Sequence, residues 1–146
     1  MATRSEQIFI NLPVKDLQAT VAFFTELGYE FNPQFTDENA TQMLIGDNIF
    51  AMLLKEDFFQ TFHKEGIADT TKAREVLITI TQDSRQAVDK LVDRAFEIGA
   101  KQAGETQDYD FMYSRSFLDL DNHLWEIAYL DESALKQLQK KPLEFI

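Results

Sequence analysis

The chain opens on alternating hydrophobic and polar positions. The run IFINLPV at residues 8–14 places an aliphatic side chain at every even position. This period of two predicts a strand that buries its aliphatic face and carries Phe9 and Asn11 on the other face. The next run, LQATVAFFTEL, has helical spacing, with Asp16 as its N-cap and Gly28 as its C-cap. Three strand-like runs follow, at about 29–35, 40–46 and 48–54.

The second half of the chain repeats this order of elements. VLITIT at 76–81 predicts a strand, and SRQAVDKLVDRAFEI at 84–98 predicts an amphipathic helix that ends at Gly99. Further strand-like runs lie near 100–105, 111–119 and 123–130. The turn LDN at 120–122 mirrors the turn GDN at 46–48. Each half therefore predicts a β-α-β-β-β unit, and the self-similarity indicates an α+β protein.

We interpret residues 1–146 as a single domain with a first unit at about 7–54 and a second at about 75–130. The connector, about 55–74, has Phe58, Phe59 and Phe62 at helical spacing. It is interpreted as a helix that packs on the core, with a lid or a subunit contact as alternatives. Residues 131–146 are expected to form a terminal helix and a tail.

Composition excludes several classes of protein. Hydrophobic residues make up 45% of the 146 residues, which argues against disorder. No apolar run is long enough to span a membrane, and MATRSEQ lacks a signal-peptide core, so we expect a cytoplasmic protein without a membrane partner. Cysteine is absent, and the two histidines lie far apart in the sequence. The net charge of −11 argues against nucleic acid as a partner.

Two motifs carry a family resemblance across nearly the whole chain. LPVKDL at 12–17 and FLDLDNHLWEI at 117–127, set in paired β-α-β-β-β units, resemble the vicinal oxygen chelate superfamily. This superfamily includes glyoxalase I, bleomycin resistance proteins and extradiol dioxygenases. The chain is most similar to bacterial predicted lactoylglutathione lyases. The resemblance implies that the units form a curved mixed sheet around a cup, with the helices outside, and suggests a homodimer.

In its catalytic members the superfamily binds a divalent metal with His or Glu on the first and last strands of each unit. Aligned through the internal repeat, these positions correspond to Phe9, Met52, Leu77 and Glu126. Only Glu126 offers an oxygen ligand for such a cation, which needs three or four nitrogen or oxygen donors. We therefore expect no metal site and no cofactor.

Glu126 raises a question of its own, because a lone carboxylate among apolar strand residues is costly unless it is paired or used. It is interpreted as a structural group bonded to Tyr113 or Arg115, as a ligand-binding group, or, as the weakest alternative, as a catalytic base with a raised pKa. Arg115 has Asp119 as a further candidate partner. The predicted ligand-binding cup has eight residues: Phe9, Asn11, Met52, Leu77, Thr79, Tyr113, Arg115 and Glu126.

Together these observations predict a metal-independent protein that binds an unidentified small molecule in its cup. A glyoxalase-like lyase or isomerase with a non-standard site is the enzymatic alternative. A structural or interaction module, whose cup would be filled by side chains, is the third.

Overall fold

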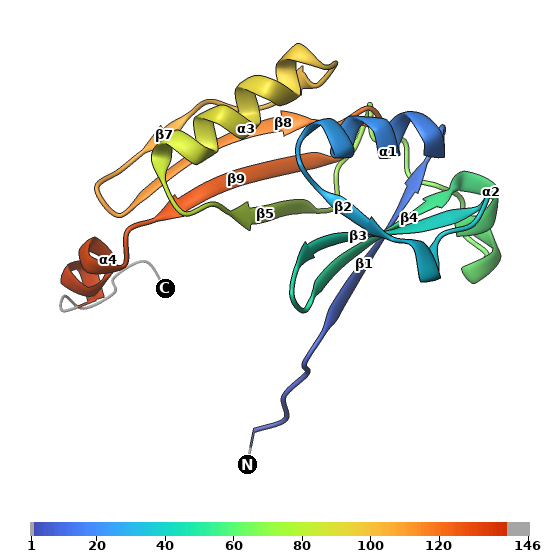
Figure 1. The fold of residues 1–146 in the computed structure, drawn as a ribbon, viewed down its shortest axis with the longest axis horizontal. Coiled ribbons are helices and arrows are strands. Elements are labelled where there is room, and N and C mark those ends of the chain that lie inside the picture. Colours follow the sequence, from blue (N-terminus) through green and yellow to red (C-terminus); the bar gives the residue numbers. More distant parts are fainter. Residues whose placement is uncertain (1, 140–146) are drawn as a thin grey trace. The chain divides into compact units, whose positions relative to one another are not determined.

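The computed structural model describes residues 2–139 of the chain (Figure 1). The chain divides into two compact units, unit 1 at Met1–Ala73 and unit 2 at Arg74–Ile146. Each unit has its own mixed sheet. Unit 1 follows the predicted β-α-β-β-β order and unit 2 follows it with one additional short strand, so the predicted α+β class is confirmed. None of the helices in the described part of the chain has the length and hydropathy needed to cross a membrane.

Unit 1 is built on a four-stranded sheet in the order β1-β4-β3-β2. Strand β1 is parallel to β4, and the other pairs are antiparallel. Its main elements are β1 (Ile8–Val14), α1 (Leu17–Glu26), β2 (Glu30–Asn32), β3 (Ala40–Gly46) and β4 (Ile49–Lys55), with a 3-10 turn at Pro33–Phe35. Asp16 caps α1 by accepting a hydrogen bond from the Ala19 N–H at 3.0 Å, as predicted.

The connector folds into two short pieces instead of one helix. They are α2 (Glu56–Phe59) and the 3-10 helix η2 (Gln60–Phe62). Phe58 meets the edge of the Phe62 ring, with 5.3 Å between ring centroids, whereas Phe59 contacts His63 at 5.0 Å. Phe62 is 68% exposed, so the expectation that this helix packs on the core is wrong for its last aromatic residue.

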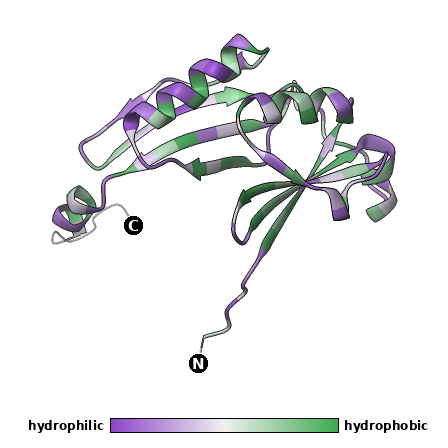
Figure 2. Cartoon of the chain, in the orientation of Figure 1, coloured by the Kyte–Doolittle hydropathy of each residue, from purple (hydrophilic) through white to green (hydrophobic). Residues whose placement is uncertain are grey.

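Unit 2 contains a five-stranded sheet in the order β5-β9-β8-β6, with β7 also paired to β8. Its elements are β5 (Leu77–Thr81), α3 (Arg85–Glu97), β6 (Lys101–Gln102), β7 (Gln107–Asp108), β8 (Met112–Leu118), β9 (Leu124–Leu130) and α4 (Glu132–Gln139). The sequence pattern did not predict β7. Hydrophilic and hydrophobic residues alternate along α3 (Figure 2), and its buried residues are Val88, Val92 and Ala95.

A polar network also connects α3 to the sheet of unit 2. The Asp89 carboxylate accepts hydrogen bonds from the Tyr113 hydroxyl at 2.6 Å and from the Arg115 guanidinium at 3.0 Å. The same guanidinium lies 2.9 Å from Asp93. The bond from Tyr113, more than the guanidinium, holds the pKa of Asp89 below its ordinary value. Two acids of α3 therefore neutralise the cation of β8.

The turn between β8 and β9 is organised by one buried carboxylate, that of Asp119. It accepts hydrogen bonds from the Trp125 indole at 2.9 Å, the Asp121 N–H at 2.9 Å and the His123 N–H at 3.0 Å. Asp119 is only 3% exposed, and its burial raises the pKa of the carboxyl in spite of these donors. Within this turn Asn122 has φ 62°, a left-handed conformation that asparagine tolerates.

Replacing Asp119 by Asn should destabilise unit 2. The amide has a single acceptor oxygen, so one of the three donors loses its partner. The Trp125 indole is the most buried of these donors. We expect a loss of about 1–3 kcal/mol in the free energy of unfolding, measured by urea denaturation. Asp110→Asn, an exposed carboxylate in the preceding loop, is the matched control and should unfold like the parent. Equal stabilities of the two variants would contradict this account of the turn.

Candidate functional site

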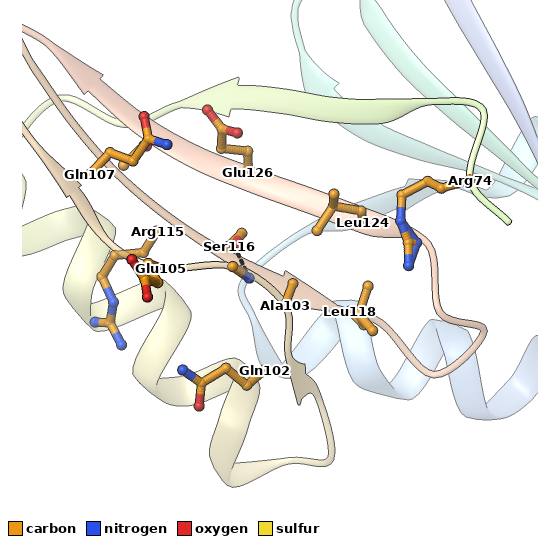
Figure 3. A pocket seen from close by; sticks show the side chains of 12 residues that line it. Arg74, Gln102, Ala103, Glu105, Gln107, Arg115, Ser116, Leu118, Leu124 and Glu126 are labelled. Atoms are coloured by element: carbon orange, nitrogen blue, oxygen red, sulfur yellow. Dashed lines mark hydrogen bonds between the residues drawn. The ribbon is translucent and has the colours of Figure 1, made fainter. Parts of the chain in front are cut away.

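Glu126 lies on a pocket of about 300 Å³ within unit 2 (Figure 3). Strands β8 and β9 supply one wall, and the chain from 102 to 107, which connects β6 to β7, supplies another. Arg74 lines the end of the pocket opposite Gln107 (Figure 3). The pocket therefore belongs to one compact unit and includes the carboxylate that the sequence singled out.

Strand register explains which side chains accompany Glu126. In the antiparallel pair, Ser116 is the partner of Glu126 and Leu118 is the partner of Leu124, so all four share one face of the sheet. On the other side of β9, Thr79 and Leu77 of β5 are the parallel partners of Glu126 and Leu124. The structure thus places the predicted cup residues Leu77 and Thr79 beside the strand of Glu126, and a further predicted cup residue, Arg115, lines the pocket with Glu126.

Arg115 lines the pocket, as predicted, but its side chain and that of Tyr113 lie on the opposite face of the sheet from the Glu126 side chain. Their register partners on β9 are Tyr129 and Ile127, one residue out of phase with Glu126. Figure 3 shows the side chains of Arg115 and Glu126 extending in opposite directions. The proposed bond between Glu126 and Tyr113 or Arg115 is therefore wrong. So is the alternative pairing of Arg115 with Asp119, because the guanidinium binds the acids of α3.

The rim of the pocket, formed by residues 102–107 and by Arg74, contacts β8 and the β8–β9 turn at two points. The Gly104 N–H donates a hydrogen bond of 3.0 Å to the Ser116 hydroxyl oxygen. A Cβ atom added to Gly104 would lie 3.4 Å from this oxygen, an ordinary van der Waals contact. At the other end, the Arg74 guanidinium lies 3.5 Å from the backbone carbonyl of Asn122. Both attachments connect the rim to the strands and turn that carry Glu126.

The electrostatics of the pocket are set by Glu126. Its side chain is half-buried and forms no hydrogen bond or ion pair with any of residues 2–139. Arg115 also lines the pocket, but its guanidinium is neutralised by two aspartates on the other face. A half-buried carboxylate with its acceptor positions open can receive an N–H or O–H donor, or a cation, from a ligand.

The remaining cup candidates, Phe9, Asn11 and Met52, lie on the sheet of unit 1. Asn11 is the register partner of Met52, and both share a face with Phe9. The Phe9 ring stacks on Phe50 with centroids 4.9 Å apart and is 46% exposed. These three residues therefore form a patch on sheet 1, and their role in ligand binding stays a prediction.

A second hollow, of about 530 Å³, lies in unit 1 and includes none of the predicted cup residues. It is lined by residues of the α1–β2 connection and of the β3–β4 hairpin, among them Tyr29 and Phe50. Burial raises the pKa of Tyr29 to about 12, so its phenol is neutral at physiological pH. The carboxylates that line this hollow, Glu30 and Asp47, are both exposed to solvent. We therefore take the pocket of unit 2 as the candidate site.

Several residues of the site were not predicted. They are Arg74, Gln102, Ala103, Gly104, Glu105, Gln107, Ser114, Ser116, Leu118 and Leu124. The serines and leucines had a detectable signal, because a hairpin centred on Asp121 pairs position 116 with 126 and position 118 with 124. The segment 102–107 has no hydrophobic periodicity that would predict its place at the rim.

Comparison with known proteins agrees with the motifs. Residues 7–46 match the family described as bleomycin resistance protein-like N-terminal. A hypothetical protein from S. aureus is 24% identical, with a TM-score of 0.74 over 87% of this chain and 95% of its own. A glyoxalase/bleomycin resistance protein/dioxygenase family enzyme from Burkholderia phytofirmans is 18% identical, with a TM-score of 0.69 over 84% and 97%. None of the curated proteins matches the sequence.

A fosfomycin resistance protein, FosX from Mesorhizobium loti, is also similar in structure. It is 16% identical, with a TM-score of 0.63 over 93% of this chain and 99% of its own. At these identities the likeness establishes the fold, and the chemistry of each neighbour belongs to that neighbour. The resemblance stated from the sequence motifs is thereby confirmed: the protein has the fold of the vicinal oxygen chelate superfamily, to which glyoxalases, bleomycin resistance proteins and dioxygenases belong.

Proposed function

We propose that the protein binds a small molecule in the pocket of unit 2 without the help of a metal ion. One observation carries the proposal: Glu126 is a half-buried carboxylate that faces a pocket of about 300 Å³ and has no partner among the described residues. The size is within the range of small-ligand sites, and convergent polar groups beside apolar ones are typical of them. A purely structural module would instead fill this face with side chains.

The residues at the superfamily's metal positions do not fit a divalent cation. In unit 2 they are Leu77 and Glu126, and in unit 1 they are Phe9 and Met52, so Glu126 offers the single oxygen ligand of the four. Between residues 2 and 139 there is no group of three or more His, Cys, Asp or Glu side chains placed to hold a metal ion. This donor chemistry supports binding without a metal.

The described lining of the pocket also supports binding over catalysis. It contains no histidine, lysine, tyrosine or cysteine, so Glu105 is the one further group suited to proton transfer. Glu105 is exposed to solvent on the rim. A lyase or isomerase acting here would therefore depend on Glu126 with little assistance.

Filling the pocket should abolish binding. Ala103 lines the rim, and Ala103→Trp places an indole in the space that a ligand needs. We expect fragments detected by saturation-transfer NMR on the parent protein to lose their signal with this variant. Ala22→Trp, on the exposed side of α1, is the matched control and should retain every fragment signal.

Shift mapping provides a test that needs no variant. The amides of Gly104, Ser116 and Glu126 should move on addition of the same fragments to the parent protein. The proposal would be rejected if no fragment in the screen bound the parent protein. It would also be rejected if the bound fragments shifted amides elsewhere and still bound the Ala103→Trp variant. Circular dichroism of both tryptophan variants checks that they fold.

Metal should be dispensable. Elemental analysis of the purified protein should find well under one equivalent of zinc or nickel per chain, and chelators should leave fragment binding unchanged. Without a metal to polarise the substrate, methylglyoxal and glutathione should give no turnover above background. One equivalent of tightly held metal that disappears with Glu126→Ala, or turnover that chelators suppress, would refute this part of the proposal.

We further propose a homodimer, and we retain the cytoplasm as the predicted location. The exposed ring of Phe62 and the adjacent Phe58 support an apolar contact. The sequence of Pro142 to Ile146 is also largely apolar, and this segment lies outside the described residues. Light scattering at micromolar concentration should give twice the mass of the chain, and Phe62→Ser should lower it. A monomeric mass for the parent would contradict the dimer.

A further inference from the structure

Glu126 leaves the pocket with an anionic charge that no described residue offsets. It forms no ion pair. Arg115 also lines the pocket, but its guanidinium is bound to Asp89 at 3.0 Å and to Asp93 at 2.9 Å on the opposite face. Glu105 adds a second carboxylate at the rim. Arg74, the remaining lining cation, lies at the far end of the pocket beside the Asn122 carbonyl (Figure 3).

The pocket is arranged in levels along the sheet. The Ser116–Glu126 pair forms a polar level, and the Leu118–Leu124 pair forms an apolar level two residues away. This separation is about 7 Å, at the usual rise of a strand, and a chain of four or five carbon atoms spans it. Arg74 follows beyond the apolar level, so the charges of the pocket run from negative at Glu126 to positive at Arg74.

We propose that the pocket selects an organic cation, an alkylammonium or alkylguanidinium group, and this inference rests on the proposed function of the pocket. The charged head binds Glu126, and its remaining N–H donors reach the Ser116 hydroxyl oxygen, which already accepts the Gly104 N–H. The alkyl body lies on Leu118 and Leu124. Arg74 repels a cation from the other end and thereby sets the orientation.

The charge of the protein acts in the same direction. The net charge of −11 attracts cations toward the surface and repels carboxylates and phosphonates. An anionic ligand would have to approach two carboxylates of the pocket, Glu105 and Glu126. Among the described lining residues, Arg74 is the only cation without an acidic partner that could attract it. Net charge and local charge therefore favour the same class of ligand.

The test compares four probes of similar size on the parent protein. They are n-butylammonium, n-butylguanidinium, neutral n-pentanol and the anion n-butylphosphonate, each titrated while the amides of Gly104, Ser116 and Glu126 are followed by NMR. We expect saturable shifts with both cations, at least tenfold weaker binding of the alcohol, and no saturation with the phosphonate. The cation affinity should fall as salt is added, because charge attraction is screened.

Variants then assign the selectivity to one side chain. Glu126→Gln keeps the volume and removes the charge, and it should weaken both cations at least tenfold while leaving the alcohol unchanged. Glu38→Gln, an exposed carboxylate of unit 1, is the matched control and should behave like the parent. Cations that bind Glu126→Gln as well as the parent would overturn the inference.

Comparison of the probes on the parent protein remains decisive if Glu126→Gln does not fold. Phosphonate or alcohol binding as tight as that of the cations would overturn the cation inference while leaving the pocket a binding site. Cations that give no saturable shift would overturn it as well. If, in contrast, no fragment at all bound in the pocket of the parent protein, the proposed function itself would be rejected.

Discussion

The buried carboxylate of Asp119 determines the geometry on which the candidate site depends. By accepting N–H groups from Asp121, His123 and the Trp125 indole, it closes the turn between β8 and β9 around one centre. The hairpin register follows from that centre and aligns Ser116 with Glu126. The structure of the turn thus explains most of the motif FLDLDNHLWEI, whereas the Glu126 side chain has no hydrogen-bond or ion-pair partner among residues 2–139.

Local sequence patterns predicted the elements because each had a local cause. Period-two runs marked the long strands, Asp16 capped α1, and glycines with positive φ, 102° at Gly28 and 115° at Gly99, ended both helices. The connector after β4 differs from the single helix that was predicted, because its aromatic residues pair in two directions instead of forming one packed face. The short β7 gave no signal, because a strand of two residues has no periodicity.

The site was harder to predict, because its contacts are long-range. Arg74 reaches the carbonyl of a residue 48 positions later, and the rim meets β8 through a backbone N–H, which no side-chain pattern reports. The misplacement of Tyr113 and Arg115 has a different cause. Their partner Asp89 belongs to a helix whose apolar spacing was recognised, but whose acidic residues were not matched to the facing strand. A half-buried cation is stabilised by a nearby counter-charge, so the acidic residues of α3 were the signal that Arg115 faces this helix.

The two faces of the β8–β9 hairpin consequently serve separate purposes. On the face toward α3, the cation of β8 and the Tyr113 hydroxyl both have partners: Arg115 binds Asp89 and Asp93, and Tyr113 binds Asp89. On the other face, the carboxylate of Glu126 has none among the described residues. Burying a charge without compensation is unfavourable, and side chains on the two faces of a strand make separate contacts, so an apolar residue at this position would remove no described contact of the hairpin. A carboxylate in this position is therefore better explained by what enters the pocket than by the stability of the fold.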